Sequence, residues 1–340
     1  WSFQTSKEIL SSPVVVNNTV YIGSNDHYMY ALDADNGEIV WKFETGSWVQ
    51  SSPAVVNGII YFGSNDGKLY ALDAATGHKL WDFDANRPVT SSPAVANGMV
   101  FFGGWDYYIY SLDARTGAIV WKYKTNGYII SSPVINNGIL YVGSNDGSCY
   151  ALNASTGRFR LKLTRYEVLS PPAVNGETIY FTSAKYLVAM DGMARNWLFE
   201  EPIRFWWSEF YLMRFLPPPP PITGLLGGTR VSYYNNTNTG PVYSDGNIYT
   251  TGDNKIYRID PKTKKITWTF ITGGRVYAAP GIANGVVFGA SDDGKLYAIG
   301  ATDGKKIWDY QTGGKISASP TYAKGIVYVA SEDGKLYALQ

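Results

Sequence analysis

Few side chains in this sequence are of the types that perform acid–base, nucleophilic or metal chemistry, and those few stand apart. The two histidines, His27 and His78, fall in predicted turns on opposite sides of the fold, so they cannot share a zinc site. Cys149 takes a strand position that other segments fill with leucine, which predicts a small buried residue. No dinucleotide fingerprint, P-loop or zinc-protease motif occurs. The sequence therefore carries no motif for a specific reaction.

Aspartates recur in short turns that read "SNDG", "SDDG" or "SEDG". They are Asp66, Asp146, Asp293 and Asp333. Because they recur at a regular interval, we interpret them as turn carboxylates that accept hydrogen bonds from nearby backbone N–H groups. Metal binding or catalysis is the alternative.

These turns belong to a repeat that fills the chain. Its units open with Ser-Ser-Pro or a variant near residues 11, 51, 91, 131, 170, 239, 278 and 318. A period near forty residues indicates a propeller blade or a helical array. Short β-branched and aromatic runs separated by Asn-Gly and similar turns favour four strands in each unit. We therefore predict an all-β fold, an eight-bladed β-propeller of four-stranded antiparallel blades.

The two ends of the chain are expected to complete one blade. The last unit stops at Gln340 before its fourth strand, and Trp1 precedes Ser11 by the interval that separates Trp81 from Ser91. Residues 1–10 should then close the ring and remove its open sheet edges. The prediction is a single propeller over residues 1–340, with an insertion over residues 200–238 that follows the fourth strand of blade five.

Composition excludes several classes of partner. The chain has 340 residues, of which 45% are hydrophobic and 17% charged, with a net charge of +1. This balance predicts no nucleic-acid partner. No apolar run is long enough to span a membrane. The single cysteine excludes an internal disulfide.

Function is expected where the repeat is broken. The turn between the second and third strands of a blade and the link to the next blade share one face, here called the upper face. Large or charged residues interrupt the repeat on this face, and they form a candidate surface for a partner or ligand: Trp48, Arg87, Trp105, Tyr107, Tyr128, Tyr166, Arg275 and Lys315. Trp48, Tyr128, Lys315 and Trp105 should together form an aromatic, mildly basic mouth. An ordinary loop surface is the alternative.

The insertion is unusually apolar for a loop. Its aromatic residues Phe205, Trp206, Trp207, Phe210 and Tyr211 precede a run of prolines, Pro217 to Pro221, which should form a stiff rod. Two interpretations stay open. The insertion packs onto its own propeller, or it contacts a protein partner, a sister subunit or a membrane surface.

The segment "ALDAATGHKLW" and its copies resemble the tryptophan-docking repeat of propellers of the pyrroloquinoline-quinone (PQQ) type. The family includes quinoprotein dehydrogenases, the non-catalytic lipoprotein of the outer-membrane barrel assembly machine, and receptor sensor domains. The resemblance implies that indoles dock between neighbouring blades, and these would be Trp1, Trp41, Trp81, Trp121, Trp268 and Trp308.

From the resemblance we expect a non-catalytic platform outside the cytoplasm that binds a protein partner or sister subunit without a cofactor. The first alternative is a PQQ-dependent dehydrogenase, which would use PQQ with calcium. Against it, the chain lacks the adjacent cysteine pair of many alcohol dehydrogenases and has no carboxylate cluster outside the repeat. The second alternative is the ligand-sensing domain of a larger receptor.

Overall fold

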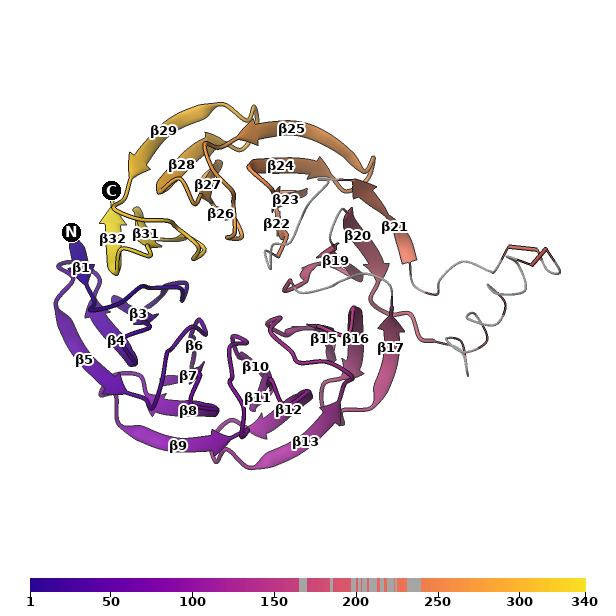
Figure 1. The fold of residues 1–340 in the computed structure, drawn as a ribbon, viewed down its shortest axis with the longest axis horizontal. Coiled ribbons are helices and arrows are strands. Elements are labelled where there is room, and N and C mark those ends of the chain that lie inside the picture. The colour runs from indigo at the N-terminus through magenta and orange to yellow at the C-terminus, as the bar shows by residue number, and fades with distance from the viewer. Residues whose placement is uncertain are drawn as a thin grey trace.

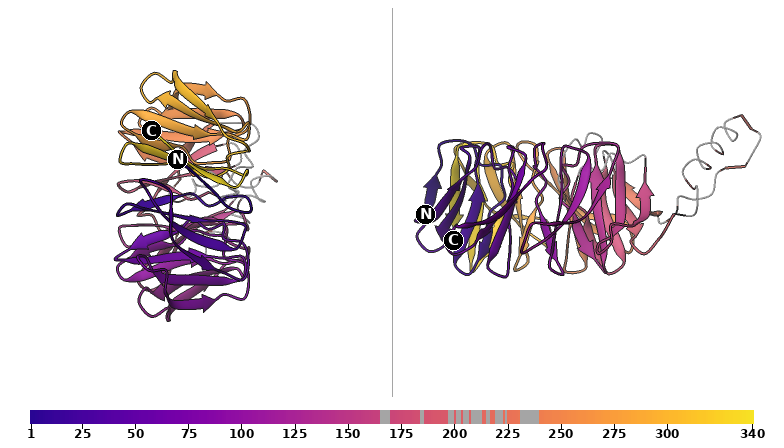
Figure 2. Two further views of the ribbon diagram at one scale, coloured as in Figure 1. Left: turned by 90° about the vertical axis from the view of Figure 1, so that its left-hand side faces the viewer. Right: turned by 90° about the horizontal axis from the view of Figure 1, so that it is seen from below.

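The chain forms a closed ring of eight four-stranded antiparallel sheets around a central opening, which confirms the predicted propeller (Figure 1). The computed structural model describes residues 1–164, 170–183, 186–196, 225–230 and 240–340, with single residues and pairs between 200 and 223. Seen from its edge, the ring is a flat disc (Figure 2). Within each sheet the first strand lies innermost and the fourth forms the rim.

The first four sheets follow one another along the chain. Sheet one contains β2 (Val14–Val16), β3 (Thr19–Gly23), β4 (Tyr28–Asp33) and β5 (Ile39–Glu44). Sheet two contains β6 (Ala54–Val56), β7 (Ile59–Gly63), β8 (Lys68–Asp73) and β9 (Lys79–Asp84). Sheet three contains β10 (Ala94–Ala96), β11 (Met99–Gly103), β12 (Tyr108–Asp113) and β13 (Ile119–Lys124). Sheet four contains β14 (Val134–Asn136), β15 (Ile139–Ser144), β16 (Ser148–Asn153) and β17 (Phe159–Leu163).

The remaining four sheets complete the ring. Sheet five contains β18 (Ala173–Asn175), β19 (Thr178–Ser183), β20 (Tyr186–Asp191) and β21 (Leu225–Arg230). Sheet six contains β22 (Val242–Ser244), β23 (Asn247–Gly252), β24 (Lys255–Asp260) and β25 (Lys265–Ile271). Sheet seven contains β26 (Gly281–Ala283), β27 (Val286–Ala290), β28 (Lys295–Gly300) and β29 (Lys306–Gln311). Sheet eight contains β30 (Thr321–Ala323), β31 (Ile326–Ala330), β32 (Lys335–Leu339) and β1 (Ser2–Gln4).

The N-terminal strand closes the ring, as predicted. In sheet eight, Ser2 pairs with Tyr337 and Gln4 with Lys335. The backbone N–H of Ala338 donates to the carbonyl oxygen of Trp1 at 2.9 Å. The N- and C-termini therefore lie side by side on one sheet (Figure 1).

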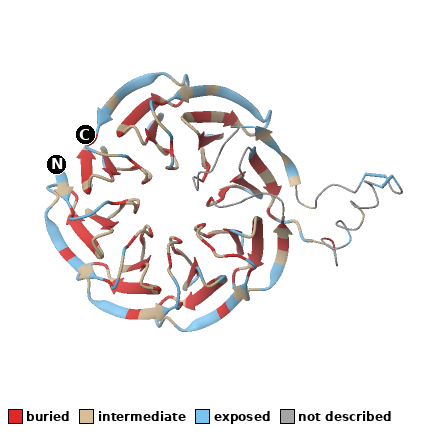
Figure 3. Cartoon of the chain, in the orientation of Figure 1, coloured by how far each residue is buried: buried red, intermediate tan, exposed pale blue. Residues whose placement is uncertain are grey.

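The core lies between neighbouring sheets rather than on one face of each. In β7 and β8, residues 60–63 and 69–72 are buried without alternation, because each sheet packs against a neighbour on both faces. Figure 3 shows this burial in the second and third strands of the sheets, while the rim strands are largely exposed. The unbroken apolar runs of the sequence therefore become strands that are covered on both sides.

Indole side chains join neighbouring sheets at the rim. The Trp121 N–H donates to the carbonyl oxygen of Ala154 in the next sheet at 2.8 Å. Four further indoles, those of Trp1, Trp41, Trp81 and Trp268, donate to the equivalent alanine carbonyls at 2.9–3.1 Å. A Cβ at Gly157 would lie 2.6 Å from the Trp121 ring, so the turn that receives the indole needs glycine. Trp308 has the same strand register but is 37% exposed.

Sheets four and five depart from this pattern. Leu161 lies opposite Ala151, where other sheets have an indole. In sheet five, Gly227 lies opposite Ala189 in the same register. Trp197, which the sequence suggested for the fourth strand of blade five, lies outside the described residues.

The predicted position of the insertion is wrong. The range 200–238 includes β21, which is the fourth strand of sheet five, so the long connection runs from Asp191 to Leu225 between the third and fourth strands. Its ends lie on the face opposite the inter-blade links, not on the upper face. The error arose because β21 reads "LLGGTR" and has no indole to mark it as a rim strand.

Candidate functional site: the upper face

The links and the turns between second and third strands form one continuous face. The backbone N–H of Asn65, in such a turn, donates to the carbonyl oxygen of Trp48, in the preceding link, at 2.8 Å. Asn25 makes the same bond to Glu8 at 3.0 Å. Residues from turns and links are therefore neighbours on the upper face.

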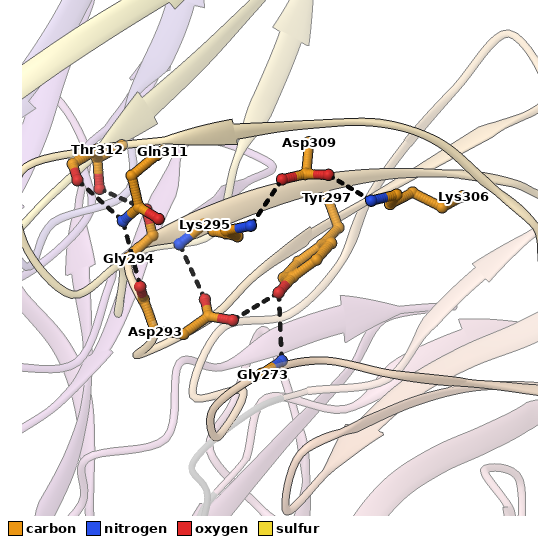
Figure 4. A network of polar contacts seen from close by, with 9 residues as sticks. All are labelled: Gly273, Asp293, Gly294, Lys295, Tyr297, Lys306, Asp309, Gln311 and Thr312. Atoms are coloured by element: carbon orange, nitrogen blue, oxygen red, sulfur yellow. Dashed lines mark hydrogen bonds and ion pairs between the residues drawn. The ribbon is translucent and has the colours of Figure 1, made fainter.

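The turn aspartates of this face are occupied by structural contacts (Figure 4). One oxygen of Asp293 accepts the backbone N–H of Lys295 at 2.9 Å, and the other accepts the Tyr297 hydroxyl at 2.5 Å. Burial, aided by this carboxylate, raises the pKa of Tyr297 to about 12. Asp66, Asp146 and Asp333 make the equivalent bonds to a backbone N–H and a tyrosine. These carboxylates hold the turn, as their periodicity predicted.

Two of these turns contain a side chain where the backbone conformation favours glycine. The residue after the turn aspartate has φ of 95° at Gly67 and 80° at both Gly147 and Gly294, but His27 and Tyr107 adopt 79° and 74°. A residue with a Cβ is strained in this region. Tyr107 is 44% exposed, so its ring contributes little to the core.

Trp105 is held in place at the central opening. Its indole N–H donates to the Thr90 hydroxyl at 2.9 Å, and its ring stacks on Tyr128 with centroids 5.2 Å apart and planes at 25°. It is nevertheless 43% exposed. The opening that it lines has a volume of about 430 Å³. Trp105 and Tyr128, two residues of the expected mouth, are therefore in contact.

Trp48 lines a second hollow of about 510 Å³ beside the opening. Lys7, Glu8 and Glu332 contribute its charged groups, and the amide of Gln50 donates to Asn25 at 3.2 Å. Of the four residues expected to form the mouth, Trp48 and Trp105 line two adjoining hollows, whereas Tyr128 and Lys315 line neither.

The two arginines of the candidate surface lie outside both hollows. Arg87 and Arg275 are exposed. Arg275 lies 3.9 Å from the carboxylate of Asp253 and donates to the Tyr277 hydroxyl at 3.3 Å. Sequence reasoning missed Tyr277, which lines the central opening, although an aromatic residue in a link is the same signal that selected Tyr128.

Most of the predicted insertion surface is not described by the structure. Tyr166 of the fourth link and Phe205, Trp206, Phe210 and Tyr211 of the insertion lie outside the described residues. Trp207 is half-buried, and its indole N–H donates to the Pro217 carbonyl at 3.0 Å. At the base, the buried Glu200 carboxylate accepts from the Asn196 amide at 2.7 Å and from the backbone N–H of Thr223 at 3.2 Å. These bonds tie the two ends of the insertion together.

The single cysteine is not a reactive nucleophile, and the described residues contain no metal cluster. Cys149 is fully buried, and burial raises the pKa of its thiol to about 12, so the thiolate that would react is not formed near neutral pH. Among the residues that the structure describes, no three His, Cys, Asp or Glu side chains lie together as a metal site would need. No helix of the described part of the chain is long and apolar enough to cross a bilayer.

The ring closure and the four-stranded sheets define an eight-bladed propeller, in which indole–carbonyl bonds join neighbouring blades. Within that class, the chain belongs to the family described as outer membrane protein assembly factor BamB, which it matches over residues 1–52, 31–129, 108–196 and 222–340. No curated protein matches the chain.

Solved structures share this fold at low sequence identity. BamB from Moraxella catarrhalis superposes with a TM-score of 0.76 at 16% identity, covering 99% of this chain and 97% of that one. The computationally designed Ika8 protein gives 0.81 at 15%, covering 99% and 97%. Quinohemoprotein alcohol dehydrogenase from Comamonas testosteroni gives 0.77 at 17%, covering 99% and 75%. The fold is thus shared by a designed protein, an assembly factor and an enzyme.

The described residues of the central opening do not fit PQQ. That cofactor is a tricarboxylic quinone, and the dehydrogenase alternative would use it with calcium. The described lining consists of serine, threonine, glutamine, aromatic and apolar residues, and it includes neither a cation for the carboxylates nor a carboxylate for calcium. Trp105 could stack on a quinone, but its indole ring would neither pair with the PQQ carboxylates nor bind calcium.

Proposed function

We propose that this protein is a non-catalytic propeller that acts as a rigid platform and presents its upper face to a protein partner outside the cytoplasm. Membership of the assembly-factor family supports this role and this location. The absence of fit between PQQ and the described lining of the opening supports a binding role over an oxidoreductase role.

The observation that carries the proposal is the strained, exposed Tyr107. In four other sheets the equivalent position is glycine, which adopts a similar φ without steric cost, and in sheet one it is His27. Backbone strain persists where function requires the residue, and an exposed ring that adds little to the core is best explained by a contact with another molecule. Tyr107 is therefore the residue that we assign most directly to partner binding.

The surroundings of Tyr107 suit a protein interface. Tryptophan, tyrosine and arginine dominate the binding energy of protein interfaces. The upper face exposes Trp48, Trp105 and Tyr107, and Arg87 and Arg275 are exposed on the same face. Because the blades pack rigidly, these side chains should lose little conformational entropy when a partner binds.

The insertion is a second proposed contact, with the sister subunit, the partner or a membrane surface. Its apolar composition supports this role. Since its ends lie on the face opposite the links, a partner that used both surfaces would have to reach around the rim at sheet five.

The experiment is co-purification from the source cells with single substitutions. Tyr107→Ser and Arg275→Ser should each reduce recovery of the partner at least tenfold. The matched control is Leu80→Ser on the rim strand β9, where the side chain is 50% exposed, and recovery should not change. Equal recovery with all three variants would contradict the assignment of the upper face.

A calorimetric titration with PQQ and Ca²⁺ separates this proposal from the dehydrogenase alternative. No binding is expected at micromolar cofactor. One-to-one binding accompanied by dye reduction would replace the platform with an enzyme.

A further inference from the structure

The central opening is lined by a ring of equivalent serines whose hydroxyls are fixed by their neighbours. The backbone N–H of Ser12 donates to the Ser52 hydroxyl at 2.9 Å, Ser52 to Ser92 at 2.9 Å, and Ser92 to Ser132 at 3.0 Å. Ser319 donates in the same way to Ser12 at 2.9 Å. A hydroxyl that accepts one such bond still has a proton to donate and a further lone pair. The opening therefore presents several groups that can both donate and accept.

This lining favours a neutral polar ligand over an ion. The described residues around the opening carry no formal charge. A charged ligand would lose its hydration without gaining an opposite charge. A ligand rich in hydroxyls can instead exchange bonds to water for bonds to the serines and to Gln50.

Trp105 adds an apolar plate to the polar ring. Tyr128 stacks against one face of the indole, and the N–H is bonded to Thr90, so the ring is fixed before a ligand arrives. Since Trp105 lines the opening and is substantially exposed, its other face is available. A flat aromatic face beside hydroxyl groups matches a pyranose ring, which has an apolar C–H face and a polar edge.

The site continues into the second hollow. Leu10 and Gln50 line both spaces, so the central opening and the Trp48 hollow are contiguous. Trp48 provides a second aromatic plate there, with Asn25 and Gln50 beside it. The two carboxylates of its lining, Glu8 and Glu332, outnumber its one ammonium group, Lys7, so an anionic ligand is disfavoured and hydroxyl donors are favoured. Each hollow falls within the range of about 300–1,000 Å³ typical of ligand sites.

We propose that the upper face binds a neutral oligosaccharide, with one sugar ring on Trp105 in the central opening and another on Trp48 in the adjoining hollow. Tyr107, Arg87 and Arg275 lie outside both hollows, so the protein contact assigned to them can be tested separately from the saccharide site. A saccharide site would give the platform a second ligand of a different chemical class.

The test uses the purified full chain on an array of neutral oligosaccharides of two to eight units, together with carboxylated and sulfated analogues. The tightest neutral binder is then titrated by calorimetry. Trp105→Ala and Trp48→Ala should each weaken its affinity at least tenfold. Trp308→Ala on the rim strand β29 should leave the affinity unchanged, since that indole lies outside both hollows.

Three results would overturn the inference: no neutral oligosaccharide binds, the acidic analogues bind more tightly, or both hollow variants keep full affinity. Thermal melting of each variant shows whether it is folded, and the two exposed tryptophans provide independent tests. If no sugar binds while Tyr107→Ser still loses the protein partner, the saccharide inference fails and the proposed function stands.

Discussion

Replacing Tyr107 with glycine should stabilise the protein while weakening its interaction with a partner. Tyr107 adopts φ of 74° in a turn where Gly147 has 80° and Gly294 has 80°. Left-handed backbone at a residue with a Cβ costs about 1–2 kcal/mol. The greater freedom of glycine in the unfolded chain offsets about 0.4–1 kcal/mol of the gain. The free energy of unfolding should therefore rise by about 1 kcal/mol in Tyr107→Gly.

The expected change in melting temperature follows from the size of the chain. An unfolding entropy of about 2.1 cal/mol/K per residue gives about 0.7 kcal/mol/K for 340 residues. A gain of about 1 kcal/mol then raises Tm by about 1.5 °C. Differential scanning calorimetry on the two proteins, side by side, resolves a shift of this size.

Gly147→Tyr is the matched control, because it places tyrosine at the equivalent turn position of sheet four. A Cβ at Gly147 would meet no atom within 4 Å, so the substitution adds backbone strain without a clash. It should lower Tm by about 1.5 °C. A Tyr107→Gly protein that melts lower than the unmodified chain would refute the reasoning, because Tyr107 would then stabilise the fold rather than serve a contact outside it.

Three further predictions concern the ring and the insertion. Trp121→Phe removes the bond to Ala154 and part of a buried ring, so it should lower the free energy of unfolding by about 2–3 kcal/mol and Tm by about 3–4 °C. Trp308 is more exposed, so Trp308→Phe should lower Tm by less than about 1 °C. Equal shifts in Tm would contradict a role for the buried indole bond. Burial, together with a carboxylate partner, raises the pKa of Tyr297 and Tyr337 to about 12, so these hydroxyls keep their protons in the folded chain when the unfolded chain has lost them. Tm should therefore hold below pH 10 and fall as the pH rises from 10 through 12. A constant Tm between pH 10 and 12 would exclude this linkage. Replacing Ile203–Pro221 with a short Gly-Ser link keeps Glu200 and Thr223 at the base of the insertion. Because each blade mainly contacts its neighbours, Tm should change by less than about 2 °C. Loss of the folded ring would show that the insertion is part of the core.

The fold was predictable because each blade repeats the same local signals. Asn-Gly turns such as Asn57–Gly58, with φ of 53° and 77°, specify hairpins from a few residues. The interval between Trp1 and Ser11 predicted the closing strand, since it copies the interval between Trp81 and Ser91. In a periodic sequence the repeat interval shows which residues are equivalent in each blade, and the strand pairing can be predicted from that equivalence.

Sheet five shows where this reasoning ends. Its rim strand β21 has Gly227 where the repeat has an indole, and the connection before it is long. The repeat therefore gave no signal for the position of the fourth strand in this sheet. The candidate site was only partly predictable for a related reason. Sequence spacing brought Trp105 and Tyr128 to one face, but the division into two hollows depends on side-chain directions that spacing does not fix.

The most direct test of the platform role is a photo-cross-linking map made in the source cells. A photoreactive phenylalanine analogue is placed singly at Tyr107, Arg87 and Arg275 on the upper face, and at Leu80 and Ile307 on the rim, all of which are exposed. The account predicts that the upper-face positions cross-link to one common protein and that the rim positions do not. Cross-linking that is confined to the rim, or absent from all three upper-face positions, would contradict the account.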